Sequence, residues 1–253
     1  MKTGRGKMEL HLKEEHRVEF GEVDFKERLT LNGIIYYMQQ VAANHALKLN
    51  FSYYKNEEKT SYFWIVARVK FIIDKYPKWQ EQVAIETYPG GHDKLFAVRL
   101  FDLTNVKGEK IGHIIGDYIL MDAKTNRPVK IKGAPAPLDI LDFPYKGETL
   151  EKIQVPTTFE KEDFRKVRYS ELDVNEHMNN AQHVRWAVDM LPIEIFEHKE
   201  IATLQINYTT GIEYGTSVWM RLHYDEQGEV VIWATNREDT IQYFIVKLTL
   251  RNL

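Results

Sequence analysis

RVEFGEVDFKERLTLNGIIYY, residues 17–37, aligns without a gap with KVRYSELDVNEHMNNAQHVRW, residues 166–186. Apolar side chains fall at matching positions in both copies, and four positions are identical. The identical pairs are Val18 and Val167, Glu22 and Glu171, Asp24 and Asp173, and Glu27 and Glu176. An internal repeat of this kind predicts that the chain holds two copies of one structural unit.

Each copy leads into a segment with helical periodicity. After the first copy, apolar residues recur at spacings of three and four from Leu31 to Leu49, which predicts a long helix with one buried face. A second, shorter helix is predicted over about residues 180–190. The Asn179–Asn180 pair supplies its N-cap, and Pro192 ends it.

Strands are predicted after each helix, because runs rich in Val, Ile, Phe and Tyr alternate with Pro- and Gly-containing turns. The expected strands are 62–73, 82–88, 94–103 and 110–121 in the first half, and 201–208, 217–224, 229–235 and 240–251 in the second. Turns are expected at 76–77, 89–91, 105–108, 122–128 and 226–228. Each half is therefore a lead strand, one helix and an antiparallel meander. A helix with an apolar stripe needs a concave sheet face to cover it. The sequence thus predicts an α+β fold with two antiparallel sheets, each wrapped around a long helix.

The composition limits the function classes. The chain has 253 residues, 43% of them hydrophobic and 28% charged, and a net charge of −3, which is typical of a soluble globular protein and gives no reason to expect nucleic acid. No apolar run is long enough to span a membrane. With no cysteine, disulfides and a thiol nucleophile are excluded, and a cytoplasmic location is expected. The scattered histidines indicate no metal site.

Pro and Gly are frequent in residues 133–156, GAPAPLDILDFPYKGETLEKIQVP, which predicts a linker over the surface. The expected organisation is an N-terminal domain over 8–132, this linker, and a C-terminal domain over 157–253.

The run Asp173-Val174-Asn175-Glu176-His177, followed by Asn179-Asn180, resembles the motif of plant and bacterial acyl-ACP thioesterases. Further landmarks come in the family's order and spacing, and the resemblance covers most of residues 8–253. They are WIVAR at 64–68, PKW at 77–79, ETY at 86–88, GDYILMD at 116–122 and NRP at 126–128. The resemblance implies a tandem, or double, hotdog fold. It also implies hydrolysis of fatty acyl-acyl carrier protein thioesters to free fatty acid in fatty acid biosynthesis, with acyl carrier protein as partner and no cofactor.

Carried over from the family, Asp173, Asn175 and His177 take the catalytic positions. Thioester hydrolysis needs a donor for the developing oxyanion, which the Asn175 amide offers, and a base near pH 7, which His177 offers. Asp173 can hold either of them in place. The competing interpretation is capping and turn chemistry before the helix, a structural role that Asp24 and Asp173 would share. In extended backbone, residues two apart share one face, so the three side chains are expected together. Because Lys26 and Arg28 stand at the matching positions of the first copy, we expect the second half to be catalytic and the first to bind the acyl chain.

One departure from the family concerns a Glu that is usually followed by Cys in a strand after the helix. Here these positions hold Gly211 and Ile212, so direct attack by water is favoured over a thiol mechanism. Glu213, two residues on, becomes a candidate base if a bulge near Gly211 brings it back. Otherwise Asp173 or His177 has to serve as the base, and Glu213 is a solvated turn residue.

Four residues are expected to contact the acyl chain: Met38, Val41, Ala42 and Trp64. A plain core role is the competing interpretation of the helical ones. Four basic residues flank the motif and are expected to dock the acidic carrier protein, unless they form an ordinary solvated face: Arg165, Lys166, Arg168 and Arg185.

The alternatives to acyl-ACP hydrolysis are an acyl-CoA thioesterase and a non-catalytic acyl-binding double hotdog protein. A hotdog hydratase fits the first-half landmarks less well. The chain is expected to be a monomer or a homodimer, with monomer preferred because the fusion already supplies two hotdogs.

Overall fold

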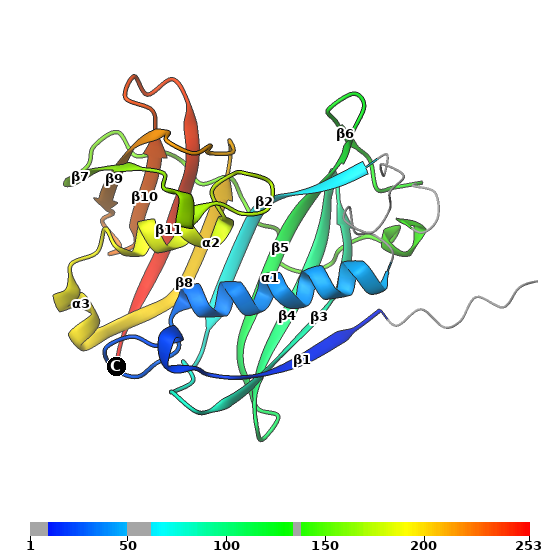
Figure 1. The fold of residues 1–253 in the computed structure, drawn as a ribbon, viewed down its shortest axis with the longest axis horizontal. Coiled ribbons are helices and arrows are strands. Elements are labelled where there is room, and N and C mark those ends of the chain that lie inside the picture. Colours follow the sequence, from blue (N-terminus) through cyan, green and yellow to red (C-terminus); the bar gives the residue numbers. More distant parts are fainter. Residues whose placement is uncertain (1–9, 50–61, 134–137) are drawn as a thin grey trace, which may run out of the picture. The chain divides into compact units, whose positions relative to one another are not determined.

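The computed structural model describes residues 10–49, 62–133 and 138–253, which form a large antiparallel sheet with few helices (Figure 1). Two compact units are distinguished. Unit 1 comprises Met1–Val66 and Lys75–Thr149, and unit 2 comprises Ala67–Asp74 and Leu150–Leu253. The expected start at residue 8 and residues 134–137 of the expected linker lie outside the described residues.

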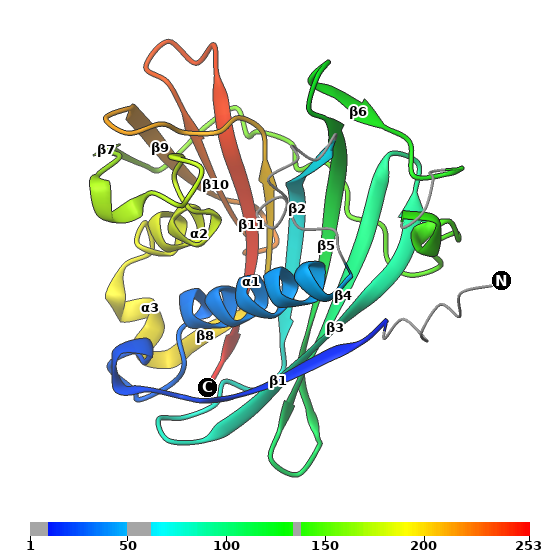
Figure 2. The ribbon, with the colours of Figure 1, turned by 45° about the vertical axis from the view of Figure 1, so that its right-hand side comes forward.

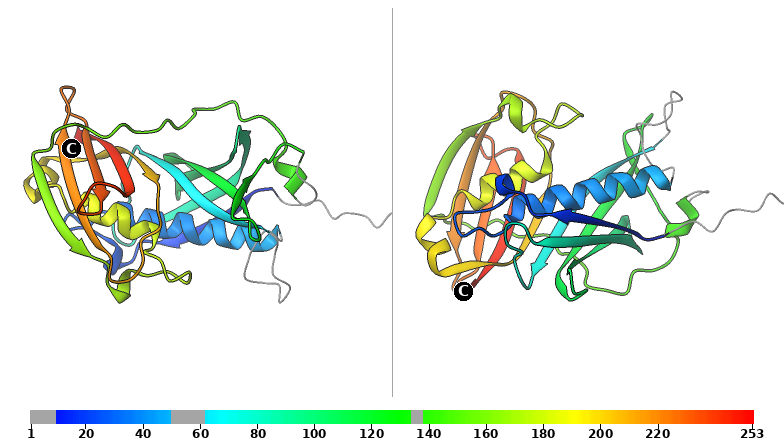
Figure 3. Two further views of the ribbon diagram at one scale, coloured as in Figure 1. Left: turned by 90° about the horizontal axis from the view of Figure 1, so that it is seen from above. Right: turned by 60° about the horizontal axis from the view of Figure 1, so that its bottom comes forward.

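Unit 1 has the strand order β1-β3-β4-β5-β2, with β6 paired to β5. Helix α1 crosses the face of these strands, and β1 lies alongside it (Figures 2 and 3). The elements are β1 Leu12–Arg17, η1 Phe20–Glu22, α1 Leu31–Lys48, β2 Tyr62–Ile73, β3 Gln82–Asp93, β4 Phe96–Asn105, β5 Lys110–Asp122, β6 Arg127–Val129 and η2 Leu138–Leu141.

Unit 2 has the strand order β8-β11-β10-β9-β7, and the end of β2 from Arg68 to Ile72 pairs with β8. Helix α2 packs against β11. The elements are β7 Lys161–Lys166, η3 Tyr169–Glu171, α2 Asn180–Val188, α3 Ile193–His198, β8 Lys199–Tyr208, β9 Ser217–Tyr224, β10 Val230–Thr235 and β11 Gln242–Asn252.

The predicted helices are confirmed. In α1 the buried side chains include Ile34, Ile35 and Met38, as the periodicity requires, and Thr30 caps the helix by accepting from the Gly33 N–H at 3.1 Å. In α2 the Asn179 side chain accepts from the Ala181 N–H at 2.8 Å. This helix ends at Val188, two residues before the predicted end, and Pro192 precedes the short helix α3, which was not predicted.

The turn expected at residues 89–91 is wrong, because β3 continues to Asp93 through a register shift between Pro89 and Gly91. Gly91 has φ 95°, and a Cβ there would lie 2.4 Å from the carbonyl oxygen of Phe143. Glycine therefore lets the segment around Phe143 approach β3, where the His92 N–H donates to that oxygen at 2.8 Å.

Hydrophobic residues of the expected linker are buried. In unit 1, Leu138 and Leu141 join a core cluster with Leu120. In unit 2, Leu150 is 1% exposed and Ile153 belongs to a cluster with Trp233, while Gln205 donates to the carbonyl of Glu151 at 2.7 Å. These side chains tie the two ends of the segment to different units.

The two repeated stretches form the same turn. The N–H of each conserved aspartate donates to the carbonyl oxygen four residues on, Asp24 to Arg28 at 2.8 Å and Asp173 to His177 at 2.7 Å. A short antiparallel bridge closes each turn, and each contains a glutamate with positive φ. These glutamates are Glu27 with φ 60° and Glu176 with φ 63°.

The other pair of matching glutamates, Glu22 and Glu171, anchors each turn to the following helix. Glu22 accepts a hydrogen bond from the Tyr37 hydroxyl at 2.5 Å, and Glu171 accepts one from the Trp186 indole Nε1 at 2.7 Å. Both aromatic partners occupy the last position of the repeated stretch. The sequence repeat therefore reflects one local architecture built twice.

His183 lies in the core of unit 2 and is 3% exposed. Its Nδ1 lies 3.0 Å from the carbonyl oxygen of Asn179, and its ring packs edge-on against Tyr208 and Phe244. Burial lowers the pKa of His183 from 6.5 to about 4, although the hydrogen bond to Asn179 acts in the opposite direction. The imidazole is therefore neutral in the folded protein at neutral pH.

This burial predicts acid sensitivity. Because the folded-state pKa of His183 lies below the unfolded value, the unfolded chain binds more protons between about pH 4 and 6.5, and stability falls as the pH drops through that range. Between pH 7.5 and 5, the wild type should lose roughly 2 kcal/mol more unfolding free energy than His183→Leu. Denaturant unfolding at both pH values measures this difference. His198 is exposed, so His198→Leu should lose as much unfolding free energy as the wild type. An equal loss in all three proteins would contradict the low pKa of His183.

Candidate functional site

Asp173, Asn175 and His177 lie in the second of the two matching turns. The extended backbone expected for them is wrong, because the turn is closed by the Asp173–His177 backbone bond and Glu176 has positive φ. The Asp173 carboxylate shapes the turn by accepting from the Asn175 N–H at 2.8 Å. It also lies 3.5 Å from the Asn175 side-chain nitrogen. The three residues are thus brought together by local hydrogen bonds rather than by strand alternation.

The imidazole of His177 is oriented by the backbone. Its Nδ1 lies 2.7 Å from the carbonyl oxygen of Asn175. Because a carbonyl oxygen can only accept, Nδ1 carries a proton, and in the neutral form of the imidazole Nε2 therefore carries the lone pair. His177 is exposed, so this nitrogen can receive a proton from a water molecule.

Gly211 leaves room beside the His177 ring. A Cβ at this position would lie 2.8 Å from Cδ2 of His177 and 3.4 Å from Nε2. Any larger residue would therefore have to displace the imidazole or contact its free nitrogen.

Glu213 forms an isolated antiparallel bridge with His177. Residues paired in this way have Cβ atoms about 4.5–5.5 Å apart. Glu213 is exposed, and its segment belongs to none of the named strands. Within the part of the chain that the structure describes, no hydrogen bond or ion pair joins the two side chains. Glu213 is thus a near neighbour of the imidazole without being bonded to it.

The first copy of the turn carries different chemistry. Arg28, at the position of His177, donates from Nε and Nη2 to Oδ2 of Asp24 at 3.1 and 2.9 Å. Arg28 bridges to Lys78, just as His177 bridges to Glu213. An ion pair therefore occupies the turn in unit 1 where unit 2 holds an exposed imidazole.

The basic residues expected to dock a carrier protein differ in their surroundings. Arg165 contacts Asp163 at 3.2 Å and Asp189 at 2.9 Å, and its guanidinium lies 5.7 Å from the centre of the Trp186 ring. Its charge is therefore already paired. The other three are exposed: Lys166, Arg168 and Arg185.

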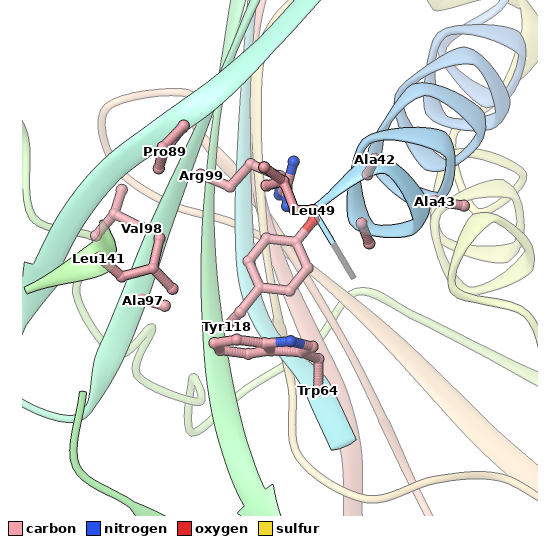
Figure 4. Close-up of a pocket in the computed structure, with 11 residues that line it drawn as sticks. Ala42, Ala43, Leu49, Trp64, Pro89, Ala97, Val98, Arg99, Tyr118 and Leu141 are labelled. Atoms are coloured by element: carbon pink, nitrogen blue, oxygen red, sulfur yellow. The ribbon is translucent and has the colours of Figure 1, made fainter. Parts of the chain in front are cut away.

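Unit 1 contains a cavity of about 190 Å³ lined by residues of α1, β2–β5 and η2 (Figure 4). Of the residues expected to contact an acyl chain, Ala42 and Trp64 line it. Met38 and Val41 are 4% and 0% exposed and do not belong to the described lining. The sequence reasoning missed Arg99, which also lines the cavity. An arginine between apolar residues of an expected strand was the available signal.

Within residues 10–49, 62–133 and 138–253, His, Asp and Glu side chains do not gather in threes around a possible metal position. Helices in the same ranges are too short or too polar to cross a membrane.

Comparison with known proteins finds a matching domain family for each half of the chain. Residues 9–134 match the acyl-ACP thioesterase N-terminal domain, and residues 154–246 match the acyl-ACP thioesterase C-terminal domain.

Relatives of known function share about a quarter of the sequence. The oleoyl-acyl carrier protein thioesterase 2 of Arabidopsis thaliana is 26% identical over 214 residues, which cover 78% of this chain and 58% of that protein. The dodecanoyl-[acyl-carrier-protein] hydrolase of Umbellularia californica is 25% identical over 200 residues, covering 74% and 52%. The chain thus spans a little over half the length of these two relatives.

Solved structures show the same fold. The acyl-ACP thioesterase from Bacteroides thetaiotaomicron superposes with a TM-score of 0.84 and 22% identity, covering 95% of this chain and 98% of that one. The 12:0-ACP thioesterase from Umbellularia californica gives a TM-score of 0.82 with 19% identity, covering 98% and 100%. The fold is therefore of the hotdog type. With both of its domains matched in order along the sequence, the chain belongs to the acyl-ACP thioesterase family.

Proposed function

We propose that this chain hydrolyses fatty acyl-acyl carrier protein thioesters and releases free fatty acid in fatty acid biosynthesis. The observation that carries the proposal is the exposed His177 imidazole, whose Nδ1 lies 2.7 Å from the Asn175 carbonyl oxygen and whose Cδ2–Nε2 edge lies close to Gly211. This arrangement lies in the part of the chain that matches the family's C-terminal domain. The named activities of the relatives support the same reaction.

The reaction is a direct attack by water. Nε2 of His177 takes a proton from the water as its oxygen bonds to the thioester carbonyl carbon. The Asn175 amide donates to the oxygen that becomes negative, and Asp173 holds the turn that positions both residues. The carbon–sulfur bond then breaks, and the proton passes from His177 to the departing thiolate. Glu213, the cross-strand neighbour of His177, is the second candidate base.

The fold that goes with this function is a tandem double hotdog, with antiparallel strands and one central helix in each half, α1 of 18 residues in the first and α2 of 9 residues in the second. The duplicated turn and its conserved glutamate anchor support this division. In it, residues 8–132 bind the acyl chain and residues 157–253 carry out the chemistry. The cavity lined by Ala42 and Trp64 supports acyl binding in the first half.

Docking of the acidic carrier protein relies on exposed basic residues around the motif. Lys166, Arg168 and Arg185 are exposed and suited to this role. Arg165 contributes less, because its guanidinium is held by two carboxylates.

The proposal predicts the outcome of a substitution at the base. His177→Ala should abolish release of free fatty acid from acyl-ACPs of C8 to C18 while leaving the melting temperature and acyl binding intact, because the side chain is exposed. Asn175→Ala should lower kcat by about 10²–10³-fold, the usual cost of one oxyanion donor. Arg28→Ala, the matching substitution in the first copy, should turn over acyl-ACP at the wild-type rate.

Further arms of the same assay separate the alternatives. Glu213→Gln leaves the rate unchanged if His177 is the base and lowers it if Glu213 is. Faster turnover of acyl-CoA than of acyl-ACP would indicate an acyl-CoA thioesterase. No turnover on any chain, with tight acyl binding, would indicate a non-catalytic binding protein and overturn the proposal.

A second prediction concerns the space beside the imidazole. Gly211→Ala should lower kcat by more than about 10-fold, because its Cβ would lie 2.8 Å from Cδ2 of His177 and must displace the ring. The KM for acyl-ACP should change little. Gly21→Ala is the matched control, since a Cβ there meets nothing within 4 Å. If both variants retain wild-type kcat, the position of the His177 ring does not control the reaction.

A further inference from the structure

The cavity of unit 1 has a charged side chain in its lining, which is unusual for a site that binds hydrocarbon. Its lining is mostly apolar, with alanines of α1, Trp64 of β2 and Leu141 of η2. Among the lining residues that the structure describes, Arg99 of β4 is the one charged side chain (Figure 4). A guanidinium therefore faces the space in which an acyl chain would lie.

Arg99 is held by neutral partners. Its Nη1 donates to Nδ1 of His45 at 2.9 Å and approaches the Thr87 hydroxyl at 3.3 Å. Because a guanidinium only donates, Nδ1 of His45 must accept, so this imidazole is neutral. Within the described ranges no carboxylate forms an ion pair with Arg99. Both of these hydrogen bonds leave from Nη1, so Nη2 and Nε keep donors available among the described residues.

Tyr118 of β5 adds a hydroxyl to the same wall. Gly116 is the cross-strand partner of Arg99, and a Cβ on Gly116 would lie 2.8 Å from Cε2 of Tyr118. The phenol therefore lies over Gly116. Figure 4 shows Tyr118 and Arg99 side by side in the cavity. Burial raises the pKa of Tyr118, so its hydroxyl keeps the proton and can donate a hydrogen bond at neutral pH.

A saturated chain cannot satisfy these donors. A charge without a counter-ion in a poorly hydrated site is costly, and burial accordingly lowers the pKa of Arg99. The group that matches a planar guanidinium fork is a carboxylate, which accepts two parallel hydrogen bonds. The alternative is that Arg99 only ties α1 to the sheet through His45.

We propose that this cavity binds aliphatic chains bearing a carboxylate, which pairs with Arg99 beside the Tyr118 hydroxyl. The inference deepens the proposed thioesterase function. Its part on hydrolysis rests on that function, whereas its part on carboxylate binding does not. The carboxylate has two possible sources: the far end of an ω-carboxyacyl substrate, or the fatty acid that hydrolysis releases.

Calorimetric titration tests the site without any turnover. Decanoate should bind the wild type at least about 10-fold more tightly than 1-decanol, as expected for a charge-assisted hydrogen bond. This preference should disappear in Arg99→Met and shrink in Arg99→Lys, which keeps the charge but loses the fork. Tyr118→Phe should weaken decanoate binding several-fold. Arg127→Met, which removes an exposed arginine of the same unit, is the matched control and should keep the preference. If Arg99→Met does not fold, the Lys and Phe variants carry the comparison.

Hydrolysis of ω-carboxydecanoyl- and decanoyl-ACP separates the two sources. A higher kcat/KM for the ω-carboxyl substrate, lost in Arg99→Lys, assigns the site to the incoming chain. No such advantage, with competitive inhibition by decanoate that Arg99→Lys relieves, assigns it to the product. Equal affinity of the wild type for decanoate and decanol overturns the inference even if both thioesters are hydrolysed. A retained decanoate preference without any hydrolysis would instead contradict the thioesterase proposal alone.

Discussion

The hydrogen bond from the Asp173 N–H to the His177 carbonyl closes the turn on which the proposed chemistry depends. The Asp173 carboxylate accepts from the backbone amide of Asn175, and the Asn175 carbonyl in turn orients the His177 ring. Glu171 holds the whole turn against α2 through Trp186. Because the bonds among Asp173, Asn175 and His177 are local, the turn is specified within a few residues and can carry an exposed imidazole in a fixed orientation.

The same turn in unit 1 shows what the scaffold does without a reactive group. Asp24 and Glu22 make the equivalent backbone and aromatic contacts, so the architecture does not require Asn or His. Arg28 instead closes an ion pair with Asp24. The backbone bonds that follow also correspond: Leu29 bonds to the carbonyl of Pro77, and Met178 to that of Ile212. By this correspondence Gly211 matches Tyr76, so unit 2 has a glycine beside its imidazole where unit 1 has a tyrosine.

Sequence alone predicted the features that depend on local periodicity. The α1 stripe and the strand 62–73 follow from the spacing of apolar residues, and the repeat identified the two stretches that share one architecture. The conformation of residues 173–177 was missed, because alternation assumes extended backbone and the positive φ of Glu176 has no strong signal in sequence. The continuation of β3 through Gly91 was missed for a different reason. It depends on Phe143, about fifty positions along the chain. The exposure of Arg99 to a cavity likewise depends on contacts between separate elements.

The protonation of His177 tests the account most directly. Nitrogen-15 NMR of histidine-labelled protein at neutral pH, with the His177 signals assigned by their loss in His177→Gln, reports which ring nitrogen carries the proton. We predict that the neutral form of the ring is protonated at Nδ1, which leaves Nε2 free to act as base. A neutral ring protonated at Nε2 would contradict the account, because Nε2 could then not accept a proton from water.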